Sequence, residues 1–409
     1  MTTLHDLAVL NGRVVGANGV TEGGVLVCGG RIAAIGRFDV PEGIERIDAR
    51  GALIAPGLID VGAFAIDLPA FVAGGITRAV LMPDQAQPLD TVALVQRAAA
   101  AGKPDVWVHP LAAATRALAG QELAEIGLMG QAGACGIATG RGWIGSTGLM
   151  YRLLGYAGAL GLRTVTHAED SALAGHAVMT DGETATRLGL SSAPVEVEAL
   201  AVARDLLLVE ATGAPVHFRQ VTTARALDLV RAAKARGLPV SCGITPAHLF
   251  LADHAVTGFR TFARLSPPLR DEADRRACLA AVADGTIDLI CSGHDPHGAE
   301  AKRLPFADAE PGMAGAETLL ALSLSLVRDG VIGIERLFAM LAGTPARLFN
   351  LPGGAIAEGA EADLILVDPD APWRIESDAL AASAGNTPFD GLPVQGRVLR
   401  TIKGGKVVR

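Results

Sequence analysis

The chain has 409 residues, half of them hydrophobic, with 35 basic and 43 acidic side chains and a formal net charge of −8. A chain of this length and composition can bury a large core and form more than one domain. The acidic balance argues against a nucleic-acid-binding protein, which normally presents a basic face. Polar residues interrupt the apolar runs well before the roughly 18–20 residues that span a bilayer. The N-terminal sequence lacks a basic and then apolar pattern, so we expect a cytoplasmic protein with no membrane or nucleic-acid partner.

The two ends of the chain share a pattern of short apolar runs separated by tight turns. The dipeptides Asn11-Gly12, Gly29-Gly30 and Gly404-Gly405 each stand between two such runs. Asn-Gly and Gly-Gly between apolar runs favour β-hairpins. We therefore predict a small β-sandwich domain built from both termini, residues 1–54 and 352–409.

Between these segments, short apolar strands alternate with helical stretches such as 193–210 and 222–235. The predicted strand ends are 58–61, 77–82, 106–109, 135–138, 164–167, 215–218, 239–242 and 288–291. About eight strand and helix units predict an α/β protein with a (β/α)8 TIM-type barrel over residues 55–351. In such barrels the chemistry lies at the C-terminal ends of the strands.

Several motifs at these strand ends carry a resemblance to a known family. They are Ala-Pro-Gly-Leu-Ile-Asp at 55–60, His-Ala-Glu-Asp at 167–170, Ser-Pro-Pro-Leu-Arg at 266–270, Asp-Gly-Thr-Ile-Asp at 284–288, His-Asp-Pro-His at 294–297, Thr-Pro-Ala-Arg at 344–347 and Asn-Thr-Pro-Phe at 386–389. Over essentially its whole length the chain resembles the dihydroorotases of the amidohydrolase superfamily. The resemblance implies a zinc-bound hydroxide that attacks a cyclic amide, with an Asp after the eighth strand as general acid/base.

The positions at which that family binds zinc are changed in this chain. Two first-strand histidines fall on Gly62 and Phe64, and the sixth-strand ligand falls on Gln220. The eighth-strand acid/base falls on Gly293, and His167 is the only family ligand that is kept. Because zinc sites need three or four protein ligands, the sequence predicts no catalytic residue, no metal site and no cofactor.

The family's substrate-binding positions are changed as well. Its Arg falls on Ile66 and its second-strand Asn on Asp84, while the position that bridges the metals falls near Gly140 and Arg141. An anionic substrate is thus expected to lose a charge-assisted partner and to meet a carboxylate instead.

A few polar residues survive near the predicted strand ends. His167, His294, Asp295 and His297 are expected to line a vestigial pocket, and a metal or catalytic site relocated to 294–297 is the sharper alternative. A turn with Pro296 between polar residues is also an ordinary strand exit. The charged run 270–276 is interpreted as a solvated helix start, with Arg270 available for an interface.

Three functional hypotheses follow. The main one is an inactive dihydroorotase-like subunit, a pseudoenzyme of pyrimidine biosynthesis that supports the assembly and activity of aspartate transcarbamoylase. The resemblance implies this role because the fold-forming residues are kept while the ligands are lost. The second is an active metal-dependent cyclic amidohydrolase, like a dihydroorotase, hydantoinase or allantoinase, with zinc at a relocated site. The third is a small-molecule sensor that uses the vestigial pocket. The partners expected under the main hypothesis are the transcarbamoylase catalytic subunit and further copies of this chain.

Overall fold

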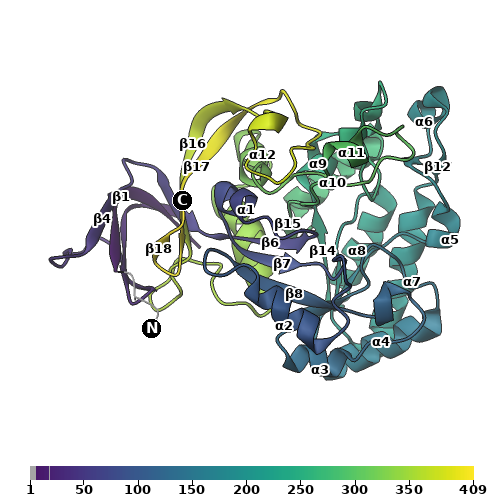
Figure 1. Cartoon of the computed structure of the whole chain (residues 1–409), viewed down its shortest axis with the longest axis horizontal. Helices are drawn as coiled ribbons and strands as arrows, with labels where there is room; N and C mark the ends of the chain where they lie inside the picture. Colours follow the sequence, from purple (N-terminus) through teal and green to yellow (C-terminus); the bar gives the residue numbers. More distant parts are fainter. Residues whose placement is uncertain (1–5, 18) are drawn as a thin grey trace.

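The strands predicted at the two ends of the chain form one sheet in the computed structural model, which describes residues 6–17 and 19–409. Its strands are β1 Leu7–Gly16, β2 Gly19–Cys28, β3 Arg31–Gly36, β4 Glu45–Asp48, β5 Leu53–Pro56, β16 Leu364–Arg374, β17 Pro393–Lys403 and β18 Lys406–Val407. They follow the order β18-β17-β16-β5-β1-β2-β3, and β4 pairs with β1. The C-terminal β16 runs antiparallel to the N-terminal β5, with Leu364 opposite Pro56. Figure 1 shows this sheet to one side of the remaining chain.

The middle of the chain forms a second sheet, and its described ladders are all parallel. Its strands are β6 Leu58–Ala63, β7 Ile76–Leu81, β8 Trp107–Ala113, β9 Gly136–Ala138, β10 Thr164–Thr166, β13 Val216–Phe218, β14 Val240–Ile244 and β15 Leu289–Ile290. Neighbours follow chain order from β6 to β15, eight strands in all. This arrangement confirms the predicted barrel. The boundaries of the two domains stay a prediction. The first barrel strand, β6, follows strand β5 of the terminal sheet after a single residue, Gly57.

A buried carboxylate connects the first and last barrel strands. Asp60 of β6 is fully buried, and its two oxygens accept hydrogen bonds from the backbone nitrogen and Oγ of Ser292, at 2.7 and 2.5 Å. Burial raises the pKa of Asp60 despite these bonds. Just beyond, the Phe64 backbone N–H donates to the carbonyl of His294 at 2.9 Å. These contacts bring the ends of β6 and β15 together and nearly close the barrel.

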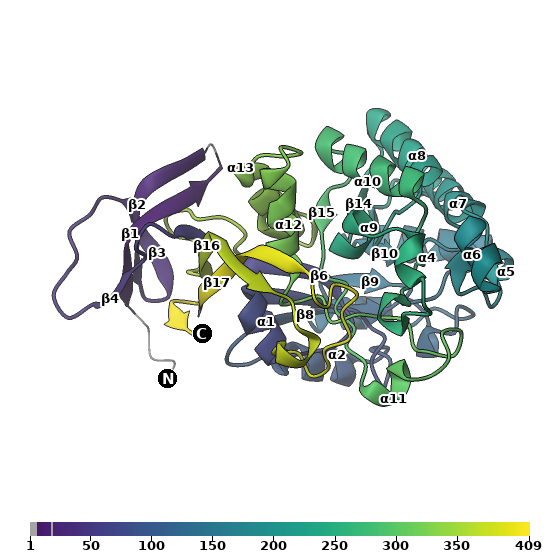
Figure 2. The same ribbon diagram turned by 90° about the horizontal axis from the view of Figure 1, so that it is seen from above.

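Helices cover the outside of the barrel (Figures 1 and 2). They are α1 Leu68–Gly74, α2 Val92–Ala100, α3 Ile126–Gln131, α4 Thr147–Ala159, α5 Ser171–Ala174, α6 Glu183–Leu188, α7 Glu196–Thr212, α8 Ala224–Ala235, α9 Pro246–Phe250, α10 Glu272–Asp284, α11 Ala299–Lys302, α12 Leu319–Arg328, α13 Ile334–Phe338 and α14 Thr344–Leu348. The two helices predicted at 193–210 and 222–235 are α7 and α8. The α8 helix begins where the Thr223 hydroxyl accepts from the Ala226 N–H, and α7 ends at Gly213 in a left-handed conformation.

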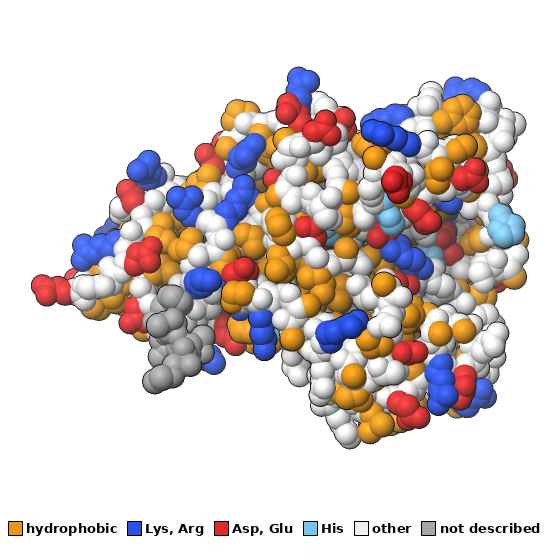
Figure 3. Space-filling view, viewed as in Figure 1, with side chains coloured by type: hydrophobic (Ala, Val, Ile, Leu, Met, Phe, Trp, Pro, Cys, Tyr) orange, Lys and Arg blue, Asp and Glu red, His pale blue; other side chains and the backbone are white. Residues whose placement is uncertain are grey.

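The barrel interior is mostly apolar and also holds the buried polar pair His217 and Ser241. Ile59 and Val61 alternate along β6 and pack there with Val80 of β7 and Val165 of β10. Phe349, just after α14, belongs to the same cluster. None of the helices in the described ranges is long and apolar enough to cross a bilayer. On the face in Figure 3, basic and acidic side chains are interspersed, which agrees with the exclusion of an extended basic surface there.

A buried arginine joins the barrel to the terminal sheet. Arg78 of β7 has only 2% of its side chain exposed and pairs with Asp363 at 2.8 Å and with Glu361, both next to β16. Its guanidinium also lies 5.3 Å from the centre of the Trp107 ring. Arg78 therefore holds together segments far apart in the sequence.

We expect Arg78→Ala to lower the free energy of unfolding by about 3 kcal/mol, because it leaves the buried Asp363 and the partly buried Glu361 without their cation. Urea unfolding followed by circular dichroism measures the change. Arg116→Ala is the matched control, since that arginine is 58% exposed and makes only long ion pairs. Equal midpoints for the two variants would contradict the role given to Arg78.

Candidate active site

The side chains that follow the barrel strands gather at one end of the barrel, which we call the mouth. They line a small cavity and come from segments far apart in the sequence: Phe64, Arg141, Arg219, Gln220, Thr245, His248, Leu265, Ser266, Gly293, Asp295, Pro311, Gly312 and Met313. The cavity measures about 20 Å³. A space of that size holds a water molecule rather than a ring, so binding of a cyclic ligand requires lining side chains to move.

The four positions where the family's functional residues were expected lie around this cavity. A side chain at Gly62 would point toward Arg219, because a Cβ placed there lies 3.5 Å from the Arg219 Cδ. Phe64 is 6% exposed and lines the cavity. Gln220 is equally buried, and its Oε1 has no hydrogen-bond partner among the described residues. Gly293 has a φ of +60°, and a Cβ there would lie 2.9 Å from Thr245 Cγ2. Restoring a larger residue at 293 therefore requires the mouth to rearrange.

His167, directly after β10, is buried and bonded through both ring nitrogens. Its Nδ1 lies 3.1 Å from an Arg219 guanidinium nitrogen, and its Nε2 lies 3.1 Å from Glu169 Oε2. A guanidinium only donates, so Nδ1 accepts and Nε2 carries the proton that it donates to Glu169. Burial by itself raises the pKa of Glu169, but the His167 hydrogen bond and the charge of Arg270 hold it at about 2. His167 has no free lone pair for a metal ion in this arrangement.

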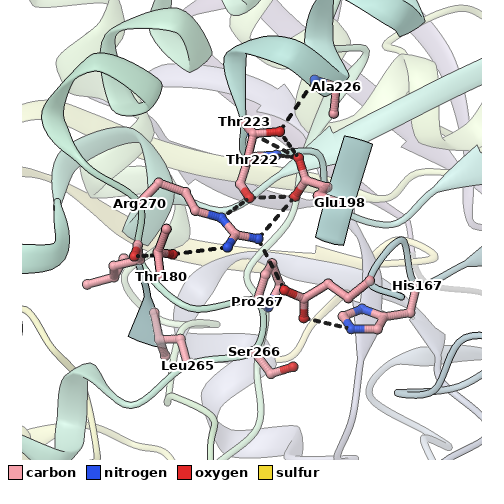
Figure 4. A network of polar contacts seen from close by, with 12 residues as sticks. His167, Thr180, Glu198, Thr222, Thr223, Ala226, Leu265, Ser266, Pro267 and Arg270 are labelled. Atoms are coloured by element: carbon pink, nitrogen blue, oxygen red, sulfur yellow. Dashed lines mark hydrogen bonds and ion pairs between the residues drawn. The ribbon is translucent and has the colours of Figure 1, made fainter. Parts of the chain in front are cut away.

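Glu169 connects His167 to a buried polar network centred on Arg270 (Figure 4). The Arg270 guanidinium lies 3.1 Å from Glu169 and 3.4 Å from Glu198, and it donates to the hydroxyls of Thr222 and Thr180. Arg270 is 4% exposed, so the expectation of a solvated helix start is wrong at this residue. Carboxylates from distant segments compensate its charge, and local sequence does not reveal them.

The His-Asp-Pro-His cluster does not stay together. His294 is fully buried away from the cavity, with Nε2 3.4 Å from Asp67 and its ring centre 5.5 Å from that of Phe71. Asp295 lines the cavity, pairs with Arg141 at 2.7 Å and lies 3.3 Å from His297. Successive residues of an extended segment point in opposite directions, so His294 faces the core while Asp295 faces the mouth. Of the four residues expected to line one pocket, His167, His294, Asp295 and His297, Asp295 alone is among the residues that line this cavity, and His294 faces away from it.

Two arginines of the mouth were missed as functional residues in the sequence. The guanidinium carbons of Arg141 and Arg219 lie 3.8 and 5.0 Å from the centre of the Phe64 ring. Arg141 follows β9 and Arg219 follows β13. Both positions are barrel strand ends, and that was the available signal. The mouth therefore contains two guanidinium groups that an anionic ligand can pair with, although Asp295 already pairs with Arg141 and the family's substrate Arg is replaced by Ile66.

Asp84 lies beside these arginines. Its Oδ1 accepts from the backbone N–H of Arg141 at 2.8 Å, while Oδ2 is buried and has no hydrogen-bond partner among the described residues. Burial raises the pKa of Asp84, although the charges of Arg141 and Arg219 act in the opposite direction. Asp84 lies beside the cavity and is not among the residues that line it. A carboxyl group with a raised pKa next to a binding site is suited to proton transfer.

Comparisons with known proteins identify the family. Residues 141–408 match the amidohydrolase family, and residues 52–225 match the dihydro-orotase-like family. A dihydroorotase from Pelobacter propionicus is 37% identical over 98% of this chain and 99% of the relative. One from Anaeromyxobacter dehalogenans strain 2CP-1 is 38% identical over 98% of this chain and 97% of its own length. The chain belongs to the amidohydrolase family.

Solved hydantoinase structures share the architecture. The L-hydantoinase (dihydropyrimidinase) from Arthrobacter aurescens superposes with a TM-score of 0.88 at 27% identity, over 99% of this chain and 96% of that one. A D-hydantoinase (dihydropyrimidinase) from Thermus sp. gives a TM-score of 0.84 at 25% identity, over 98% and 94%. These similarities extend over the barrel and the terminal sheet.

The comparisons correct two expectations. The main hypothesis of a non-catalytic, transcarbamoylase-supporting subunit is wrong, because this amidohydrolase is similar over its full length to proteins named dihydroorotase and hydantoinase. Nothing in these similarities indicates an inactive subtype. The expectation of no cofactor is contradicted as well by the match to the amidohydrolase family and to proteins named dihydroorotase and hydantoinase, a resemblance that implies zinc-assisted hydrolysis. Both expectations rested on the loss of ligand side chains at a few strand ends.

The residues of the mouth do not fit the family's zinc site. Within residues 6–17 and 19–409, no three His, Cys, Asp or Glu side chains lie close enough to hold an ion. The two nitrogens of His167 are already bonded, and Gln220 offers only a neutral amide oxygen. The chemistry considered below therefore uses the side chains that are present.

Proposed function

We propose that this amidohydrolase opens or closes a cyclic amide that carries a carboxylate, and that dihydroorotate is the first compound to test. Full-length similarity to dihydroorotases supports this reaction class. We choose a ring with a negative charge because two guanidinium groups, those of Arg141 and Arg219, lie beside Phe64 at the ends of two barrel strands. An arginine binds a carboxylate through two parallel hydrogen bonds.

The reaction consumes one water molecule. The water oxygen bonds to the ring carbonyl carbon, the C–N bond breaks, and the nitrogen takes a proton, which leaves an open-chain ureido acid with a second carboxylate. The proton that leaves the water needs an acceptor near the carbonyl. Asp84 is our candidate, because its raised pKa and unpartnered Oδ2 suit a general base, while Gly293 has no side chain for this role.

Arg141 is the proposed anchor for the ring carboxylate. Its side chain is 38% exposed, so it can turn toward an entering ligand, whereas Arg219 is 3% exposed. The charge of Arg141 is paired with Asp295 at 2.7 Å, and its guanidinium is stacked on Phe64. Movement of Arg141 together with Phe64 is also the simplest way to enlarge a cavity of about 20 Å³.

We expect the wild-type protein to open dihydroorotate, and Arg141→Met to lower kcat/KM about 10- to 100-fold, mainly through a higher KM. Methionine keeps an apolar contact with Phe64 but removes the charge-assisted hydrogen bonds. Chromatographic separation of the ring from the ureido acid measures turnover. The exposed Arg116→Met variant controls for net charge and should match the wild type.

Hydantoin, which lacks the carboxylate, provides the second arm of this experiment. The Arg141→Met variant and the wild-type protein should turn over hydantoin at rates that are equal within error. Absence of turnover of both rings by the wild-type protein would reject the proposed reaction. Association with the aspartate transcarbamoylase catalytic subunit and self-association stay predictions.

A further inference from the structure

Arg219 is a buried cation at the centre of the positions where the family places its metal ligands. Its Cδ and Cγ lie 3.5 and 3.6 Å from a Cβ placed at Gly62, its guanidinium carbon lies 5.0 Å from the Phe64 ring centre, and it donates to His167 Nδ1 at 3.1 Å. The next residue is Gln220. The guanidinium therefore lies among the residues that replace the metal ligands.

The local contacts hold Arg219 in a defined orientation. One terminal nitrogen is held by His167 and lies 3.5 Å from the Ser266 carbonyl. Behind His167, Glu169 and Arg270 continue the chain of polar contacts. Such a chain limits the movement of the guanidinium and prepares it for a ligand before the ligand arrives.

Part of this guanidinium has no hydrogen-bond partner in the protein. The Arg219 Nε is buried and unpartnered among the described residues, and so is the Oε1 of the neighbouring Gln220. Buried polar atoms of this kind are costly unless a ligand or water satisfies them. Both residues line the cavity of the mouth and are more than nine-tenths buried.

We infer that Arg219 is a catalytic residue that binds the oxygen of the scissile carbonyl, and hence the carboxylate that ring opening creates there. This inference rests on the proposed function. Negative charge develops on that oxygen as water attacks, and a fixed guanidinium stabilises this charge more than the neutral amide of the closed ring. Arg141 binds the carboxylate common to both compounds, whereas Arg219 distinguishes the open chain from the ring.

Titration calorimetry with dihydroorotate and with its ring-opened product, carbamoyl aspartate, tests this division, in proteins that all carry Asp84→Asn so that the ring stays closed during the titration. We expect Arg219→Met to weaken binding of carbamoyl aspartate about 10- to 100-fold and that of dihydroorotate less than about threefold. Arg141→Met should weaken both compounds by similar factors. Arg116→Met, which removes a charge from the exposed surface, should change neither.

Several results would overturn the inference. They are unchanged binding of carbamoyl aspartate by Arg219→Met, an equal loss for both compounds, or no binding of carbamoyl aspartate by the wild-type protein. If Arg219→Met fails to fold, Arg219→Lys carries the test, because it keeps the charge but loses the fork of donors and should show an intermediate loss.

Dialysis against a chelator tests whether the positive charge that binds the ligand comes from Arg219 or from a bound metal ion. Unchanged affinity for carbamoyl aspartate after dialysis supports the inference, and affinity that is lost and then restored by zinc alone would overturn it. The expected binding pattern without any detectable turnover would reject the proposed function and the catalytic role of Arg219, and would leave only its role in binding the carboxylate of the open chain.

Discussion

Replacing Asp84 by asparagine is expected to lower kcat for ring opening about 100-fold or more, the range typical for loss of a general base. Asparagine keeps the size of the side chain and an oxygen that can accept from the Arg141 N–H. It removes the ability to take a proton together with the negative charge of the ionised carboxylate. The rate constant measured under single-turnover conditions reports this loss without a contribution from product release.

The pH dependence of kcat distinguishes Asp84 as a general base from Asp84 as a purely structural residue. Burial raises the pKa of this carboxyl above its ordinary value of 3.8, and only the ionised form acts as a base. The kcat of the wild-type protein should therefore fall as the pH decreases through the raised pKa, and the Asp84→Asn variant should lack this dependence.

The exposed Asp228→Asn variant is the matched control, because that carboxylate is 75% exposed and pairs with Arg231 on the surface. Its kcat and pH profile should equal those of the wild-type protein. An Asp84→Asn variant with wild-type kcat would remove Asp84 from the mechanism and leave the proton acceptor unassigned.

Glu198→Ala is expected to lower the free energy of unfolding by about 4 kcal/mol, because it leaves the buried Arg270 with one fewer counter-charge. Glu198 is 1% exposed and accepts from the backbone N–H groups of Thr222 and Thr223, each at 2.8 Å, and from both hydroxyls. Alanine leaves all four donors without their partner.

Glu196 offers a control in the same first turn of α7. Its carboxylate is 44% exposed and pairs with the exposed Arg225 at 3.3 Å, so Glu196→Ala should cost less than about 1 kcal/mol. Urea unfolding of the two variants under identical conditions compares them. Equal destabilisation would show that the network around Arg270 adds little stability, and that packing of α7 accounts for the effect.

The barrel and the pairing of the two chain ends could both be predicted from the sequence alone. Alternating strands and helices depend on local periodicity, and the observed α7 and α8 begin and end within a few residues of the predicted bounds. The Gly29-Gly30 and Gly404-Gly405 turns lie in hairpins of the terminal sheet. The expected turn at Asn11-Gly12 is wrong, because these residues lie within β1 at a bulge. The strand ends also indicated that Phe64, Gln220 and Gly293 would meet at one mouth, because parallel strands place their carboxyl ends together.

Only the tertiary structure decided which charged side chains act in that mouth. Arg219 contacts His167 across 52 positions of the sequence, and Arg270 contacts Glu169 across 101. No local pattern encodes such partners. The same limit explains the error at His294, whose direction depends on Asp67 and Phe71. The lost ligands were visible in the sequence, but the arginines that bring positive charge to their place became recognisable only when the fold brought distant strand ends together.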